Sequence, residues 1–458
     1  MKFKTFLASE HMPLDSNVIT GGGTDVTDKL QQILDLAGDD CGVRLIMDGA
    51  ALIGGLDLSS NTVIECMSKD CGFYLKDDAN RSVISNKIWD LGNRQTRNIS
   101  LIGGTYNQNC LHQKHDVSVD KHIKEVSQHS ERQEDMPDGM HWVFGIELYG
   151  VENFLMRDLT ICDFRTYAVM IGGFKKVTIE DVWLALPHRM HSQNQDGFHF
   201  WGPGEFLTIR NVGGMVGDDF MNLGPDEHDG SSSITDVLVD GVFLEHADQA
   251  VRMLNYGDGR LDRVTLRNIS GTYRSFGFYI NCWFPGNAYG NYGNIFIENV
   301  DLRQETPNYN YRAPMLFSVG CNIESLTIKN VRHHMPTDNR TLFELGIPFH
   351  DLNWQFPEGN LPHMKNVLIQ DLTIIEEGEQ SANGEYIQVY LPIDHLIIRD
   401  VYLTKEQQNA NGCFITFKKQ GRIHDLIMND VYTFGLERLV DEEEKVNSFI
   451  RSNVINIK

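Results

Sequence analysis

Short apolar segments recur along most of the chain, each followed by Asn or Asp and then by one more apolar residue. Two examples are Val177-Thr-Ile-Glu-Asp-Val182 and Leu326-Thr-Ile-Lys-Asn-Val331. Apolar residues that alternate with others over four or five positions are typical of β-strands. The Asn or Asp falls 23 to 41 residues after the previous one, in most cases 28 to 31, at positions 158, 181, 211, 240, 268, 299, 330, 371, 400 and 430. Such near-regular spacing predicts a solenoid.

The segments between these strands contain Gly, Asn and Asp but no periodic stretch of helical length. We therefore expect an all-β fold, a single right-handed parallel β-helix of about ten or more coils. The Asn or Asp of each coil is expected in a tight turn, because both residues tolerate left-handed backbone geometry. One helix is predicted near the N-terminus, N-capped by Thr27, whose apolar face would cover the first coil with Leu30, Ile33, Leu34 and Ala37.

The repeat predicts one domain over residues 1–458. Residues 1–60 would form the N-terminal cap and first coils, 61–435 the coils with long loops, and 436–458 a C-terminal cap. A hydrophobic content of 41 % provides for a large core.

Composition narrows the classes of partner. With 40 basic against 63 acidic side chains the formal net charge is −23, which disfavours nucleic acid and anionic membrane surfaces. No stretch of 18 apolar residues and no secretory leader are visible, so no membrane span is expected. The eight cysteines lack paired CxxC motifs, and together with the absent leader they favour the reducing cytoplasm. Composition leaves open whether the chain forms a homo-oligomer.

Two acidic segments differ from the repeat, Asn194-Gln-Asp-Gly-Phe-His-Phe200 and Gly217-Asp-Asp-Phe-Met-Asn-Leu223. Asp196 and Asp218 are 22 residues apart, about one coil, so their carboxyl groups should stack on neighbouring coils. Inverting glycosidases hold their acid and base about 6.5 to 9.5 Å apart. Clustered carboxylates also raise a pKa among themselves, so that one can stay protonated as a general acid. The pattern indicates acid–base catalysis by Asp196, Asp218 and Asp219, although Asp-Gly and Gly-Asp-Asp are also ordinary turn sequences.

The same two segments resemble glycoside hydrolase family 28, the polygalacturonase family. Its pattern Asn-Thr-Asp-Gly, followed about one coil later by Gly-Asp-Asp, is matched by Asn194-Gln-Asp-Gly197 and Gly217-Asp-Asp219. The resemblance implies a glycosidase with Asp218 as the general acid. It further implies that Asp196 and Asp219 are bases that activate water for a single inverting displacement.

The residues that recognise the sugar in family 28 differ in this chain. Glu245-His-Ala-Asp-Gln-Ala-Val-Arg252 replaces the family's Gly-His-Gly, and Gly277-Phe-Tyr-Ile280 replaces the Arg-Ile-Lys that receives the galacturonate carboxylate. We therefore expect an oligosaccharide substrate, with a pectin-derived uronic acid as one option. Exo action would follow if the aromatic-rich insertions close the groove into a pocket. The candidate substrate-binding residues are His188, Arg189, His199, His246, Arg252, Arg274 and Trp283.

Two other functions stay open on sequence grounds. A β-helix polysaccharide lyase or epimerase would need a Lys or Arg base beside a uronate, and often Ca²⁺, but no Lys lies near the three aspartates in the sequence. A non-catalytic carbohydrate-binding β-helix would carry the same acids without using them. The favoured prediction is a glycosidase that needs neither a metal nor a cofactor.

Overall fold

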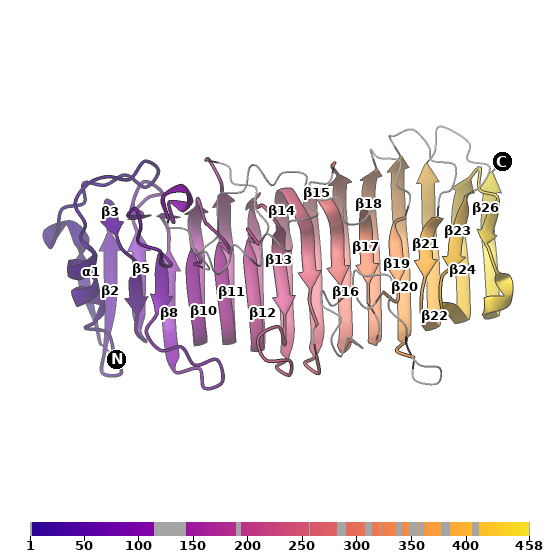
Figure 1. Ribbon diagram of the computed structural model, residues 1–458, viewed down its shortest axis with the longest axis horizontal. Helices are drawn as coiled ribbons and strands as arrows, with labels where there is room; N and C mark the ends of the chain where they lie inside the picture. Colours follow the sequence, from indigo (N-terminus) through magenta and orange to yellow (C-terminus); the bar gives the residue numbers. More distant parts are fainter. Residues whose placement is uncertain are drawn as a thin grey trace. The chain divides into compact units, whose positions relative to one another are not determined.

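The chain consists of parallel strands wound into coils, divided into two compact units, Met1–Asn222 and Leu223–Lys458 (Figure 1). The computed structural model describes residues 2–113, 143–188, 194–255, 257–281, 290–306, 314–320, 322–335, 341–347, 356, 361–376, 385–404 and 412–457. The strand connections of such a parallel sheet are right-handed. The expected all-β class and parallel β-helix are confirmed.

The first unit has three parallel ladders that meet on one long strand, β10. They run β2–β5–β8–β10, β3–β6–β9–β10 and β4–β7–β10, and β10 then pairs with β11 and β11 with β12 along nearly their whole length. One long strand therefore follows the coil around all three faces. The elements are β1 (Lys2–Leu7), η1 (Ala8–Glu10), α1 (Thr27–Leu34), β2 (Cys41–Met47), β3 (Ala50–Ile53), β4 (Leu56–Leu58), β5 (Thr62–Cys66), β6 (Gly72–Leu75), β7 (Ile84–Asn86), β8 (Thr96–Ile102), β9 (Thr105–Asn107), η2 (Cys110–His112), β10 (Ile146–Cys162), β11 (Val169–Ala185), β12 (Phe198–Met215) and the start of β13 (Asp219–Gly224).

The second unit repeats this plan with two ladders that diverge from β15. One ladder runs β15–β16–β18–β20–β22–β24–β26 and the other β15–β17–β19–β21–β23–β25. The segment expected as a C-terminal cap contains β26, which continues the first ladder. The elements are β14 (Ile234–Met253), β15 (Leu261–Ile280), β16 (Tyr292–Gln304), β17 (Met315–Val319), β18 (Ile323–Met335), β19 (Phe343–Leu345), β20 (Met364–Glu376), β21 (Glu385–Val389), β22 (Pro392–Thr404), β23 (Cys413–Phe417), β24 (Arg422–Phe434), β25 (Arg438–Val440), η4 (Glu443–Lys445) and β26 (Val446–Ile457).

The strand register reproduces the spacing of the sequence repeat. Ile297 is the register partner of Ile328, 31 residues later, and Ile328 is the partner of Ile369 across the longest step of 41 residues. All three side chains are fully buried. Insertions therefore lie between strands, and each coil adds its apolar residues to a continuous core.

The recurring Asn or Asp has the predicted backbone geometry at nine of its ten positions, with φ between 49° and 58°. The exception is Asp240, because Gly241 takes the left-handed position there with φ of 85°. The true step at this coil is therefore 27 residues, as the pairing of Val242 with Ile269 shows. Side-chain amides also connect successive coils: Asn299 Nδ2 donates to Asn268 Oδ1 at 3.0 Å.

The N-terminal helix exists, but Thr27 is its first residue and not its N-cap. The Thr27 hydroxyl instead accepts a hydrogen bond from the Gly54 amide at 2.6 Å, while the Asp25 carboxylate accepts the Thr27 amide proton at 3.0 Å. The helix buries Leu30, Ile33 and Leu34, as predicted. Within the described part of the chain, no helix has the length and hydropathy needed to cross a membrane.

Candidate active site

The two acidic segments lie on neighbouring coils, as their spacing predicts. Asp196 precedes β12, Asp218 precedes β13, and Asp219 is the first residue of β13. The Gly197 amide donates to the Asp219 carbonyl at 2.8 Å, and the Asp218 amide donates to the Gln195 carbonyl at 3.1 Å. These backbone hydrogen bonds fix the two segments side by side.

Gly197 permits this close approach of the coils. A Cβ atom at this position would stand 2.4 Å from the Phe220 carbonyl oxygen and 2.8 Å from Leu184 Cδ1. Both distances are far below van der Waals contact. The Asp-Gly dipeptide is therefore required by the contact between coils, and this contact also sets how far Asp196 lies from Asp219.

The three carboxyl groups form one cluster. One oxygen from each of Asp196, Asp218 and Asp219 lies within 4.8 Å of the other two. Asp196 and Asp219 are 3 % and 1 % exposed, whereas Asp218 is partly exposed and accepts a hydrogen bond from the Asn194 amide at 2.7 Å. The cluster thus presents one acid toward solvent and two acids beneath it.

The separation of the carboxylates does not by itself predict a stereochemical outcome. The oxygens are closer than the roughly 6.5–9.5 Å usual between the carboxyl groups of inverting glycosidases. Three carboxylate oxygens this close would also suit a hard cation such as Ca²⁺, but that ion takes about six to eight oxygen ligands. The acids alone therefore do not define a metal site.

His199 connects the cluster to two aromatic side chains. Its Nδ1 lies 2.8 Å from Asp196 Oδ2, and its Nε2 accepts a hydrogen bond from Trp201 Nε1 at 3.1 Å. The Tyr167 ring stacks on the imidazole with centroids 4.1 Å apart and an interplanar angle of 8°. The sequence predicted His199 as a substrate-binding residue, and the structure shows it in contact with Asp196, Trp201 and Tyr167.

A cluster of aromatic side chains adjoins His199, and the sequence analysis did not identify it. Its members are Trp89, Phe144, Tyr149, Tyr167 and Trp201. Tyr167 stacks on Phe144 with centroids 4.9 Å apart, and Tyr149 lies 4.9 Å from Trp89 and 6.2 Å from Trp201. Trp89 is 58 % exposed. The only signal in the sequence was the alternation His199, Phe200, Trp201, which places the first and third side chains on the same face of a strand.

A buried acid, Glu147, lies at the same register position as His199, two coils earlier. Glu147 is the register partner of Met170, which in turn is the partner of His199. Burial raises the pKa of Glu147 above its ordinary value, although hydrogen bonds from Ser82 and Tyr149 act in the opposite direction. Glu147 is thus fixed at the register position of His199, which contacts Asp196. The sequence analysis did not identify this residue.

Of the other predicted substrate-binding residues, His188 lies in the first unit. His188 binds Asp163, with its Nδ1 2.9 Å from the carboxylate, and lines a pocket of about 240 Å³ together with Tyr74 and His112. None of the three clustered aspartates lines that pocket. Arg189 and Trp283 lie outside the described residues.

The other predicted substrate-binding residues belong to the second unit and have protein partners there. His246 Nδ1 lies 2.7 Å from a Glu305 carboxylate oxygen. Arg252 stacks over the ring of Tyr279, 5.5 Å from its centroid. Arg274 is buried with Nε 2.6 Å from an oxygen of the equally buried Asp248, so a sugar carboxylate would compete with Asp248 for this cation. Sugar binding by these residues stays a prediction.

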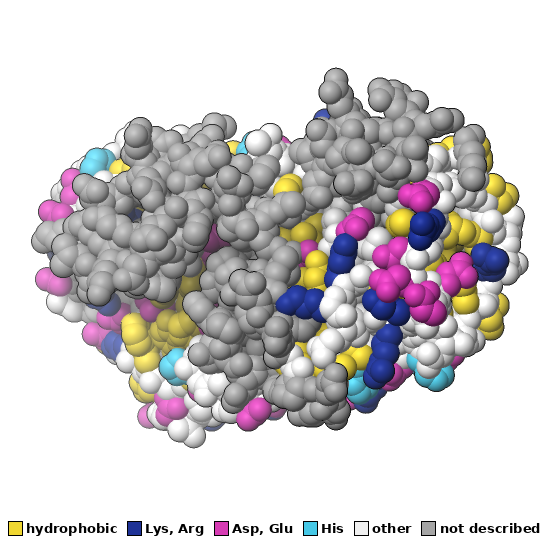
Figure 2. Space-filling model, turned by 45° about the vertical axis from the view of Figure 1, so that its right-hand side comes forward, with side chains coloured by type: hydrophobic (Ala, Val, Ile, Leu, Met, Phe, Trp, Pro, Cys, Tyr) yellow, Lys and Arg dark blue, Asp and Glu magenta, His cyan; other side chains and the backbone are white. Residues whose placement is uncertain are grey.

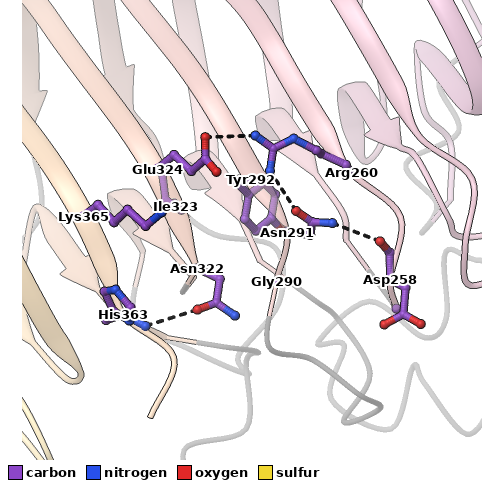
Figure 3. Close-up of a pocket in the computed structure, with 11 residues that line it drawn as sticks. Asp258, Arg260, Gly290, Asn291, Tyr292, Asn322, Ile323, Glu324, His363 and Lys365 are labelled. Carbon is purple, nitrogen blue, oxygen red and sulfur yellow. Dashed lines mark hydrogen bonds and ion pairs between the residues drawn. The ribbon is translucent and has the colours of Figure 1, made fainter. Parts of the chain in front are cut away.

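The second unit also has a polar pocket of about 570 Å³, shown in Figure 3. Arg260 lines this pocket and contacts Glu324 and Asn291 at 3.0 Å each. The clustered aspartates are not part of its lining. Among the side chains that are coloured in Figure 2, basic and acidic ones lie beside one another on the face in view.

Known proteins are similar to this chain in structure but not in sequence. No protein-family model and no curated protein matches the sequence. Among solved structures, a polygalacturonase from Erwinia carotovora matches with a TM-score of 0.50 at 12 % identity, covering 88 % of this chain and 98 % of that one. An exopolygalacturonase from Thermotoga maritima matches with a TM-score of 0.47 at 12 % identity (98 % and 92 % covered), and a mannuronan C-5 epimerase A-module from Azotobacter vinelandii with 0.47 at 11 % (99 % and 99 % covered).

The chain is therefore a parallel β-helix protein with a polygalacturonase-like fold. The structural resemblance to the Erwinia polygalacturonase extends over 88 % of the chain. At this identity the likeness concerns the fold alone, because one scaffold supports many activities. Any activity has to be argued from the site.

Proposed function

We propose that this protein is a glycoside hydrolase acting on oligosaccharides. The observation that carries the proposal is the cluster of Asp196, Asp218 and Asp219, in which oxygens from two neighbouring coils lie within 4.8 Å of one another. Glycosidic bonds are cleaved by paired carboxyl groups, one that protonates the leaving oxygen and one that acts on the anomeric carbon directly or through water. Trp89, which is 58 % exposed, and the partly exposed Trp201 offer apolar faces on which sugar rings can stack.

The different exposure of the three acids suggests their roles. Asp218, the most exposed, would give its proton to the glycosidic oxygen as the bond to the anomeric carbon breaks. Asp196 and Asp219, buried beneath it, would take a proton from the attacking water. The water oxygen then bonds to the anomeric carbon in one displacement, which inverts the configuration.

The substrate class is proposed from the sequence, in which Gly277-Phe-Tyr-Ile280 replaces the Arg-Ile-Lys that receives the galacturonate carboxylate in family 28. We infer short oligosaccharides and exo action, with a uronic acid as one option, and no requirement for a metal or cofactor. Nucleic acid and anionic membranes are disfavoured as partners by the net charge of −23. Cytoplasmic location is also part of the proposal, since the described cysteines are free thiols.

Hydrolysis of a panel of aryl α- and β-glycosides and short oligosaccharides, oligogalacturonides included, tests the proposal. Turnover by the wild type that falls at least about 10³-fold in Asp218→Asn would support it. Asp181→Asn is the matched control, because Asp181 is an exposed turn residue with φ of 55° and Asn tolerates that geometry. We expect this control to keep wild-type turnover.

The products separate the alternatives. Proton NMR of the first-formed sugar is expected to show the inverted anomer, and a retained anomer would refute the single displacement. An unsaturated product that absorbs in the ultraviolet would identify a lyase instead. Sugar binding without turnover, unchanged in Asp218→Asn, would identify a non-catalytic binding protein.

A further inference from the structure

We propose that His199 is a positioning residue: a neutral imidazole, fixed in one tautomer by Trp201, that orients the carboxylate of Asp196. The inference rests on the proposed hydrolase function, in which Asp196 is a base. It assigns to Trp201, His199 and Asp196 a hydrogen-bonded chain that ends at the reacting water.

The direction of each hydrogen bond follows from the indole group. An indole N–H can only donate, so His199 Nε2, 3.1 Å away, must accept with its lone pair. The single proton of the neutral imidazole then resides on Nδ1 and is donated to Asp196 Oδ2 at 2.8 Å. An imidazolium would point a second N–H at the indole N–H, so the contact with Trp201 opposes protonation of His199.

Packing holds the imidazole in this orientation. His199 is 1 % exposed, its ring lies flat against Tyr167, and Trp201 meets it edge-on at 86°. Met170, fully buried, is its register partner on the preceding coil. A 180° flip of the ring would place Cδ2 at the position of Nδ1 and Cε1 at the position of Nε2, and it would break both hydrogen bonds. The orientation is therefore set by the strand and its neighbours before any substrate binds.

A neutral donor suits a carboxylate that must act as a base. The Nδ1–H group favours the ionised form of Asp196 by its hydrogen bond to Oδ2. His199 cannot act as a proton relay in this arrangement, because its Nε2 lone pair is occupied by the indole. Among the described residues, the titratable groups that face Asp196 and His199 are Asp218, Asp219, Tyr167 and, beyond Met170, Glu147.

Two kinds of measurement test the inference. In the wild type, ¹⁵N NMR of labelled histidine is expected to show His199 as the neutral Nδ1–H tautomer from pH 5.5 to 8. Among variants, His199→Leu removes the donor, whereas His199→Asn places an amide N–H near the position of Nδ1. We expect kcat to fall about 10- to 100-fold in His199→Leu with little change in KM, and to recover most of that loss in His199→Asn.

The pH dependence of kcat/KM distinguishes a positioning role of His199 from a merely structural one, because a structural role would leave the acid limb of the profile unchanged. Loss of the donor disfavours ionised Asp196, so the acid limb of kcat/KM should move to higher pH in His199→Leu and return toward wild type in His199→Asn. Trp201→Phe replaces the indole by a phenyl ring, which has no N–H to donate. We expect the NMR signal of His199 in this variant to show a mixture of tautomers.

The outcomes separate this inference from the proposed function. A protonated or Nε2–H His199, or wild-type kinetics in His199→Leu, would overturn the positioning role while hydrolysis by the wild type still stands. Absence of hydrolysis by the wild type on every substrate would overturn the proposed function, and the inference with it. If His199→Leu does not fold, the NMR of the wild type and of Trp201→Phe decides the question.

Discussion

The contact between coils at Gly197 leads to a sharp prediction for Gly197→Ala. The added Cβ would stand 2.4 Å from the Phe220 carbonyl oxygen, whereas ordinary contact begins at 3.4 Å, so the two backbones must separate by about 1 Å. That movement acts on the segment that carries Asp196 and on the segment that carries Asp219. A displacement of about 1 Å at a catalytic group typically costs about 100-fold in rate. Overpacking of a well-packed interior costs about 1–3 kcal/mol of stability.

Two assays check this prediction together. Urea unfolding followed by circular dichroism should show a midpoint lowered by the equivalent of about 1–3 kcal/mol. Turnover on the substrate found in the glycoside panel should fall about 100-fold at a temperature where the variant is folded. Gly38→Ala is the control, because a Cβ there meets nothing within 4 Å and its φ is not left-handed. Full stability together with turnover within about threefold of the wild type would refute the close coil contact on which the site geometry depends.

Two further predictions concern the second unit. Phe317 is fully buried and stacks between Phe278 and Phe343, with ring centroids 4.6 and 4.9 Å away. Phe317→Ala should therefore lower the free energy of unfolding, measured by urea titration, by about 3–5 kcal/mol. A loss under about 1 kcal/mol would contradict continuous stacking of these rings in the core. Burial lowers the pKa of His333 to about 3 from 6.5, and the unfolded chain therefore binds more protons between these values. Stability should fall as the pH drops from 6.5 toward 3, by at most about 1.4 kcal/mol per pH unit, and this slope should be smaller in His333→Gln.

Much of the coil structure was predictable because each coil of a solenoid contacts only the coils next to it in the sequence. Each coil repeats the same strand and turn, so the apolar alternation and the spacing of Asn and Asp determine which residues are register partners. The spacing failed only at Asp240, where Gly241 takes the left-handed turn. Glycine adopts that geometry without strain, so the adjacent Asp can lie outside the turn. A pattern built on Asn and Asp alone could not detect this.

The sequence by itself determined the fold class, the register of most coils and the stacking of Asp196 on the coil of Asp219, because all three depend on spacing along one repeat. Tertiary structure decided which side chains meet across coils. The stacking of Tyr167 on His199, the pairing of His188 with Asp163 and the burial of Arg274 against Asp248 depend on the side-chain directions and on the neighbours that bury them. Spacing specifies which coil a residue occupies, whereas these contacts are set by the three-dimensional packing around it.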